Sequence, residues 1–145
     1  MELLVGIFTI PYYMYFGQFY KIIFYYLGIS IYILLVIFHL LTSLINPGLP
    51  PKKYFLENFK MDQSDMQNYI ICKQCKLVMD LNKGTEHCID CNICVMGNDH
   101  HCQWTSKCVG KNNLMFFNIF LILLKTHFVY LFFSLLVICY IKIAK

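Results

Sequence analysis

The sequence predicts an α-helical integral membrane protein that carries a small cysteine-rich domain between its membrane spans. Its 145 residues are 59% hydrophobic, 17% aromatic and only 14% charged, which is too apolar for an ordinary soluble domain. Two apolar runs, residues 22–45 and 114–141, are each longer than the roughly 20 residues that a helix needs to cross a bilayer. Between these runs, seven of the eight cysteines gather in the stretch from Cys72 to Cys108.

Three membrane segments are expected, two of full length and one short. Residues 1–21 contain a short apolar run, interrupted by Pro11, and a polar turn. We expect a short first transmembrane helix there, although its length suits an interfacial or re-entrant segment equally well. Residues 22–45 form the next transmembrane helix, which Asn46-Pro47-Gly48 ends. Residues 114–141 form the last one.

The segment between the two long runs is predicted to face the cytosol. It holds eight of the twelve lysines, and the positive-inside tendency places such loops on that side. The reducing cytosol would also keep its cysteines as free thiols. Residues 46–68 are either an amphipathic interfacial segment or a solvated cytosolic linker, and residues 69–113 are the cysteine-rich domain. The chain has no arginine, the residue that most often reads base edges, so we expect no nucleic-acid partner.

The spacing of cysteine and histidine in this domain is typical of zinc knuckles. Two thiolates three residues apart can turn back onto one tetrahedral metal ion, and this spacing recurs. The domain offers ten thiol and imidazole groups, of which two closed four-coordinate zinc sites would use eight. The ten groups belong to Cys72, Cys75, His87, Cys88, Cys91, Cys94, His100, His101, Cys102 and Cys108. The sequence therefore predicts a double-zinc domain of knuckles and short hairpins, with two groups to spare.

A spare thiol beside a spare imidazole suits nucleophilic catalysis, because the thiolate is the reactive form and a neighbouring base helps to make it. His100 and Cys102 are the candidate pair, with Asp99 next to them to orient the imidazole. Counting alone does not decide which groups are spare.

The same residues resemble a known family. Asp99-His100-His101-Cys102, with Trp104, Cys108-Val109-Gly110, Asn113 and Phe117 after it, is similar to the cysteine-rich domain of the Asp-His-His-Cys (DHHC) protein S-acyltransferases, or palmitoyltransferases. The resemblance covers residues 72 to 117. Asn46-Pro47-Gly48 stands where the family has Asp-Pro-Gly after its second membrane helix.

The resemblance implies two interleaved structural zinc ions. One would be held by Cys72, Cys75, His87 and Cys94, and the other by Cys88, Cys91, His101 and Cys108. It also implies that Cys102 attacks the thioester of a long-chain acyl-CoA and passes the acyl group to a cysteine of another protein. His100 would be the base and Asp99 would hold it.

The partners that the resemblance implies are long-chain acyl-CoA, the lipid bilayer and membrane-associated substrate proteins with cytosolic cysteines. The implied location is an endomembrane, in the endoplasmic reticulum or Golgi, or the plasma membrane, with the zinc domain facing the cytosol.

Some residues depart from the family pattern. The gap between Cys75 and His87 is about two residues longer than usual, a difference that a surface loop tolerates. Lys107 stands where the family generally has Asn. The family usually has a fourth span followed by a Thr-Thr-x-Glu element, and neither is seen, so we expect a truncated member with an incomplete acyl-binding cavity. The alternative function is a catalytically inactive or truncated zinc-bearing membrane adaptor, and a zinc ubiquitin ligase is a weaker third reading.

Overall fold

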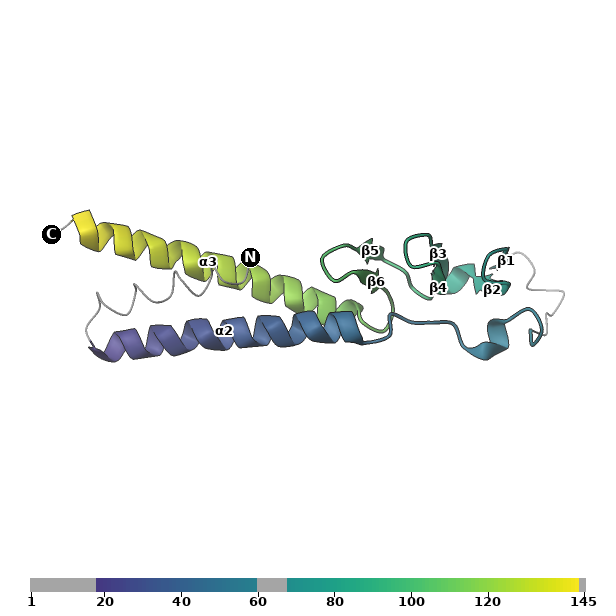
Figure 1. The fold of residues 1–145 in the computed structure, drawn as a ribbon, viewed down its shortest axis with the longest axis horizontal. Helices are drawn as coiled ribbons and strands as arrows, with labels where there is room; N and C mark the ends of the chain where they lie inside the picture. Colours follow the sequence, from purple (N-terminus) through teal and green to yellow (C-terminus); the bar gives the residue numbers. More distant parts are fainter. Residues whose placement is uncertain (1–17, 60–67, 144–145) are drawn as a thin grey trace. The chain divides into compact units, whose positions relative to one another are not determined.

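The computed structural model describes residues 18–59 and 68–143 of the chain (Figure 1). These residues belong to two compact units, Met1–Phe38 with Ile119–Lys145, and His39–Asn118, and each unit is described by itself. Most of the short first helix expected within residues 1–21 lies outside the described residues, as does the 60–67 part of the predicted interfacial segment or linker.

Two long helices form the described part of the first unit and extend into the second. Helix α2 comprises Gln18–Leu44 and helix α3 comprises Leu114–Ile143. Within them, Ile22–Leu44 and Leu114–Tyr140 are long and apolar enough to cross a membrane. Many large apolar side chains on both helices are exposed, including Ile122 and Phe128, as expected of surfaces that face lipid.

A close contact between α2 and α3 in the first unit depends on a glycine. The Tyr130 hydroxyl donates a hydrogen bond of 2.9 Å to the backbone carbonyl of Phe24. A Cβ atom built at Gly28 would lie 2.8 Å from that hydroxyl oxygen, so any side chain there would displace the tyrosine ring. Small residues at membrane helix contacts serve this purpose, because they let the partner approach the backbone.

The second unit contains three short antiparallel hairpins in sequence order. The first hairpin pairs β1 (Tyr69–Cys72) with β2 (Leu77–Asp80). The second pairs β3 (Glu86–Cys88) with β4 (Ile93–Val95), and the third pairs β5 (His100–Cys102) with β6 (Lys107–Val109). Two single-turn 3-10 helices, Lys52–Tyr54 and Leu81–Lys83, complete the regular structure of the described part of this unit.

The three hairpins share one turn geometry. In each, four residues join the strands, and the last of the four has a positive φ: 50° at Lys76, 54° at Asn92 and 50° at Ser106. Each turn also begins directly after a cysteine, namely Cys72, Cys88 or Cys102. The hairpins are therefore three copies of one structural unit.

The apolar core of the second unit is too small to be expected to hold the hairpins together unaided. One cluster of buried residues comprises Tyr54, Cys72, Leu77 and Cys94, and another comprises Cys88, Val95 and Cys108. More than half of these side chains are cysteines. Small domains with such limited cores usually depend on a metal ion or on disulfides, and all the cysteines here are free thiols.

The Asn46-Pro47-Gly48 segment joins the end of α2 to the hairpins. The Asn46 side chain accepts hydrogen bonds of 2.9 Å from the backbone N–H groups of Gly48 and Leu49, which closes an Asx turn. The Gly48 carbonyl accepts a bond of 2.8 Å from Met96, directly after β4. Gly48 has a φ of 121°, which a residue with a side chain rarely adopts.

Candidate metal centres and thiol site

Strand alternation separates neighbouring ligand residues into different groups. Successive side chains of a strand point to opposite faces, so His87 and Cys88 on β3 diverge, as do His101 and Cys102 on β5. Residues directly opposite each other in a hairpin share a face, and His87 pairs with Cys94 in this way. The same register pairs His101 with Cys108. Each histidine is thus placed with a cysteine from the opposite strand and away from its own neighbour in the chain.

Two tetrads of thiols and imidazoles result from this arrangement. The first combines the Cys72/Cys75 turn of the first hairpin with the His87/Cys94 pair of the second. The second tetrad combines the Cys88/Cys91 turn of the second hairpin with the His101/Cys108 pair of the third. One ligand atom from every member of a tetrad lies within 4.8 Å of the others.

The distances within each tetrad fit one tetrahedral zinc ion. The His87 Nδ1 atom lies 3.5, 3.3 and 3.7 Å from the sulfurs of Cys72, Cys75 and Cys94. His101 Nδ1 lies 3.6, 3.2 and 3.9 Å from the sulfurs of Cys88, Cys91 and Cys108. Sulfur and nitrogen ligands at ordinary zinc distances in a tetrahedron are separated by about 3.5 Å. The donors are therefore grouped at the spacing that a closed four-ligand site requires.

The local electrostatics also favour a cation in both tetrads. Burial, together with the adjacent Cys72 and Cys75 sulfurs, raises the pKa of the Cys94 thiol. Burial and the Cys88 and Cys91 sulfurs likewise raise the pKa of Cys108. Several thiolates close together in a buried site repel one another, so the remaining thiols stay protonated in the absence of a cation. A bound divalent cation offsets this repulsion, and metal binding therefore releases protons.

The third hairpin has the turn of a metal knuckle without the second ligand. In the first two hairpins the backbone N–H of the second cysteine donates to the sulfur of the first, at 3.4 Å for both Cys75 and Cys91. Thr105 occupies the matching position after Cys102, and its hydroxyl donates a hydrogen bond of 3.4 Å to the Cys102 backbone carbonyl. The side chain and backbone of Thr105 also lower the pKa of the Cys102 thiol. Among the described residues no further hairpin follows to supply a histidine and cysteine pair. Cys102 consequently stays outside both tetrads.

His100 lies on the same face of β5 as Cys102, two residues away, and is oriented from two sides. Its Nδ1 atom is 3.0 Å from a carboxylate oxygen of Asp99. Its ring meets the Phe117 ring edge to face, with 5.1 Å between the centroids. The structure therefore places His100 and Cys102 on β5 and Asp99 directly before that strand.

The pKa shifts of the two groups are complementary. Burial acts to raise the pKa of the Cys102 thiol, but hydrogen bonds from Thr105, His100 and the Trp104 backbone outweigh it and lower that pKa. Burial acts to lower the pKa of His100, but its hydrogen bonds with Cys102 and Asp99 outweigh that effect and raise it. A thiolate beside an imidazolium is the state that these shifts favour.

Asn113 ties the third hairpin to the end of α2 within the second unit. Its buried side-chain amide donates to the carbonyls of Thr42, at 3.1 Å, and Cys108, at 3.0 Å. Its carbonyl oxygen accepts from the Gly110 N–H at 2.8 Å. Both N–H donors and the carbonyl oxygen of this short amide thus tie the backbone around Cys108 and Gly110 to the end of α2.

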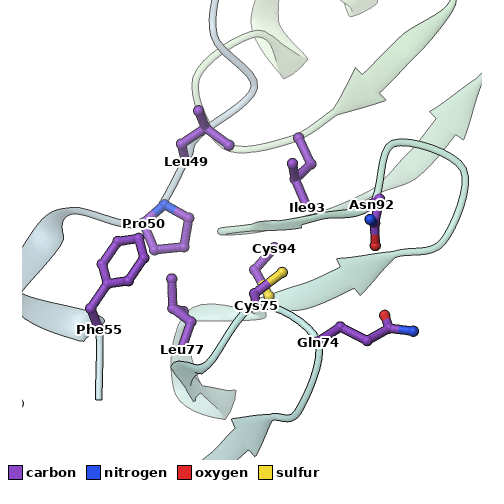
Figure 2. A pocket seen from close by; sticks show the side chains of 9 residues that line it. All are labelled: Leu49, Pro50, Phe55, Gln74, Cys75, Leu77, Asn92, Ile93 and Cys94. Carbon is purple, nitrogen blue, oxygen red and sulfur yellow. The ribbon is translucent and has the colours of Figure 1, made fainter. Parts of the chain in front are cut away.

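A pocket of about 640 Å³ lies beside the first tetrad (Figure 2). Its lining residues are Leu49, Pro50, Phe55, Gln74, Cys75, Leu77, Asn92, Ile93 and Cys94. Figure 2 shows Cys75 and Cys94 side by side in this pocket, with Phe55 and Pro50 approaching from the segment after α2. None of the lining residues belongs to β5 or β6, so this pocket is distinct from the surroundings of Cys102.

Sequence reasoning singled out every thiol and imidazole of the tetrads but overlooked Thr105. The signal was present in the repeat, because Cys102-x2-Thr105 aligns with Cys72-x2-Cys75 and Cys88-x2-Cys91 once the three hairpins are superposed by register. The hydrogen bonds of Lys107 to α2 had no signal in the local sequence, since their acceptors lie more than 60 residues earlier.

Comparison with known proteins is consistent with this arrangement. Residues 65–145 match the family model of the DHHC palmitoyltransferases. The chain is 33% identical to palmitoyltransferase ZDHHC7 of Mus musculus over 86 residues, 57% of this chain and 27% of that protein. It is 29% identical to palmitoyltransferase ERF2 of Kluyveromyces lactis over 108 residues, 62% of this chain and 30% of that protein. It is 43% identical to palmitoyltransferase SWF1 of Saccharomyces cerevisiae over 53 residues, 37% of this chain and 15% of that protein. The chain thus spans less than a third of these relatives.

Proposed function

This chain belongs to the DHHC palmitoyltransferase family, and we propose that it performs protein S-acylation through Cys102. In this proposal the chain moves a long-chain acyl group, such as palmitoyl, from acyl-CoA to cysteines of membrane-associated proteins. The observation that carries the proposal is the position of Cys102, which occupies a knuckle turn outside both tetrads and lies on the same face of β5 as His100, two residues away. The neighbouring His100 lowers the pKa of the Cys102 thiol. A reactive thiolate with an adjacent oriented base is what acyl transfer from a thioester requires.

In the first step, the Cys102 thiolate attacks the thioester carbonyl of acyl-CoA. A bond forms between the Cys102 sulfur and the acyl carbon, and the bond between that carbon and the CoA sulfur breaks. The leaving CoA thiolate takes a proton from the His100 imidazolium, whose charge Asp99 supports from 3.0 Å. The products are acyl-Cys102 and free CoA.

In the second step, the acyl group passes to the substrate protein. Neutral His100 accepts the proton of the incoming cysteine thiol, and the resulting thiolate attacks the carbonyl of acyl-Cys102. Cys102 leaves as a thiolate, beside the imidazolium that the proton transfer has just formed. The site is thereby returned to its starting state with no net oxidation or reduction.

The two tetrads would each hold one structural Zn²⁺ in this proposal. With four protein ligands and no open position, such an ion ties two hairpins together and supplies no Lewis acid. The first tetrad would tie the first hairpin to the second, and the second tetrad would tie the second hairpin to the third, which bears Cys102.

We further propose that the hairpins face the cytosol at an endomembrane or the plasma membrane, where acyl-CoA is available. The third hairpin and the start of α3 are separated by only a few residues, so Cys102 would act close to the bilayer surface. A fatty chain gains roughly 0.8 kcal/mol for each CH₂ group that it buries in apolar surroundings, which favours placing it among the membrane helices.

The test is acyl-CoA-dependent labelling of the purified chain in detergent or nanodiscs. Wild type should acquire a hydroxylamine-sensitive acyl label on the peptide that contains Cys102, and Cys102→Ser and Cys102→Ala should not. Zinc should be measured on the same samples at two ions per chain. Two bound zinc ions with no label on wild type would overturn the catalytic proposal and favour a non-catalytic zinc-bearing adaptor.

A further inference from the structure

Lys107 joins the Cys102 hairpin to the last turn of a membrane helix. Its ammonium group donates to the backbone carbonyls of Ser43, at 2.9 Å, and Leu44, at 3.4 Å. Both carbonyls belong to the end of α2, which comprises Gln18–Leu44. Lys107 also lies directly opposite Cys102 in the register of β5 and β6. Lys107 thus connects the hairpin that bears Cys102 to the end of a predicted membrane helix.

The need for this lysine arises from the sequence that ends α2. The carbonyl of Ser43 would ordinarily accept from the N–H four residues later, but that residue is Pro47, which has no N–H. The N–H that would serve Leu44 belongs to Gly48, and it bonds to the Asn46 side chain instead. Lys107 supplies donors to both carbonyls, and its charge suits the negative end of the helix dipole.

We propose that Lys107 is a positioning residue that sets the height of Cys102 relative to the end of α2, and this inference rests on the proposed acyl transfer. Among the described residues, Lys107 is the one lysine whose side chain is recorded bonding to the backbone of α2. The Asn113 bond to the Thr42 carbonyl acts beside it, on the backbone that follows β6. Lys107 thereby holds the thiol where a membrane-embedded acyl chain presents its thioester.

The first arm of the test compares Lys107→Met with Lys107→Arg in nanodiscs. Methionine keeps the length of the side chain and removes its donors, whereas arginine keeps both donors and charge. We expect Lys107→Met to lower the maximal rate of acyl labelling by up to about 100-fold, the loss that a misplacement of about 1 Å can cause. The palmitoyl-CoA concentration for half-maximal labelling should not change, and Lys107→Arg should recover most of the rate.

Lys111→Met is the matched control. Lys111 is an exposed lysine four residues further on, and its substitution removes the same charge from the same stretch of chain. It should label at the wild-type rate. If Lys111→Met lost as much rate as Lys107→Met, the effect would be due to net charge and the proposal would be overturned. The proposal would also be overturned if Lys107→Met changed the half-maximal palmitoyl-CoA concentration at an unchanged maximal rate, because that result would indicate a role in CoA binding.

A second arm does not depend on activity. Trp104 is the one tryptophan in the sequence, lies in the turn between Cys102 and Lys107, and is 77% exposed. Its quenching by lipids that carry a spin label at the headgroup therefore reports the height of the hairpin above the bilayer. We expect Lys107→Met to change this quenching while zinc stays at two ions per chain, and Lys107→Arg to restore it.

The two arms separate the two proposals. If wild type is not labelled but the quenching follows the pattern above, acyl transfer fails and the positioning contact stands. Unchanged quenching in Lys107→Met, or an unquenched Trp104 in wild type, would overturn the positioning role whatever the labelling shows. Loss of zinc in Lys107→Met would make the residue merely structural and would also overturn it.

Discussion

Cys102 occupies in the third hairpin the place that Cys88 occupies in the second. Each is the last residue of the first strand of its hairpin, and each precedes a four-residue turn that ends in a residue of positive φ. Cys88 meets the pair supplied by the next hairpin, His101 and Cys108, at a metal tetrad. Cys102 meets Thr105 instead. The difference between a candidate metal ligand and a candidate nucleophile is thus one of position in a series of repeats.

The hydroxyl of Thr105 is predicted to support the reactivity of Cys102. Thr105→Val keeps the shape of the buried side chain and removes the hydroxyl, which bonds to the Cys102 carbonyl and lowers the pKa of the Cys102 thiol. A bond to a charged group is worth about 1.5–3 kcal/mol, so we expect iodoacetamide to alkylate Cys102 at least about threefold more slowly at pH 7. Peptide mass spectrometry of the zinc-loaded chain measures this rate. Ser106→Ala is the control, because that hydroxyl bonds to the Gln103 carbonyl, and equal slowing in both variants would contradict the prediction.

The carboxylate of Asp99 should set the alkaline limb of the labelling reaction, where the rate falls because the His100 imidazolium loses its proton. Although burial lowers the pKa of His100, its bonds with Cys102 and Asp99 raise it overall. Asp99→Asn removes one of the two raising interactions, so the pKa of His100 should move down and the imidazolium should be lost at a lower pH than in wild type. The label should form about tenfold more slowly or worse at neutral pH. A rate–pH profile identical to that of wild type would argue that Asp99 has no electrostatic role.

Removing a ligand from either tetrad should have unequal effects on Cys102. Cys108→Ala breaks the second tetrad, which holds the third hairpin, so we expect one zinc per chain and complete loss of acyl labelling. Cys75→Ala breaks the first tetrad, which holds the first hairpin to the second, and should also leave one zinc while keeping measurable labelling. Metal analysis and labelling on the same preparations provide the comparison. Equal loss of label in both variants would mean that the hairpins fold as a single cooperative unit.

The backbone around Gly110 should not accept a side chain. A Cβ atom there would lie 2.6 Å from the Pro47 carbonyl oxygen and 2.6 Å from a methyl of Val95. We expect Gly110→Ala to destabilise the chain by about 1–3 kcal/mol, the range for overpacking a filled site. The loss should appear as a lower midpoint of thermal unfolding in detergent. Lys111→Ala, which adds no new atom at the next position, should leave the midpoint close to that of wild type.

The contact between Tyr130 and α2 should contribute modestly to helix association. Tyr130→Phe keeps the ring against Gly28 and removes only the 2.9 Å bond to the Phe24 carbonyl. Hydrogen bonds between membrane helices average about 0.6 kcal/mol, so the expected destabilisation is of that order. Gly28→Leu should destabilise more, because the larger side chain displaces the ring itself. Unfolding in detergent as a function of denaturant would rank the two, and the opposite order would contradict the packing described here.

Sequence alone predicted the two long apolar helices and the chemistry of the cysteine-rich domain. A run of more than 20 apolar residues has few structures open to it other than a membrane helix, so composition and length suffice. Seven cysteines and three histidines in one short stretch likewise restrict the chemistry to soft metal binding or thiol reactions. The identity of the spare groups was not settled by counting and came only with the family resemblance.

The tertiary structure decided which groups meet. His87 and Cys88 are neighbours in the chain, yet strand alternation sends them to different tetrads. The register of the hairpins gives the physical reason why each of them joins its own set of cysteines. Thr105 acquires its importance from a turn geometry shared with two other turns. Lys107 acquires its importance from the Ser43 and Leu44 carbonyls, whose usual donors are absent at Pro47 and engaged by Asn46 at Gly48. These are relations between distant backbone positions. They cannot be read from the local sequence, because these hydrogen bonds and strand pairings form only when the folded chain brings the partners together.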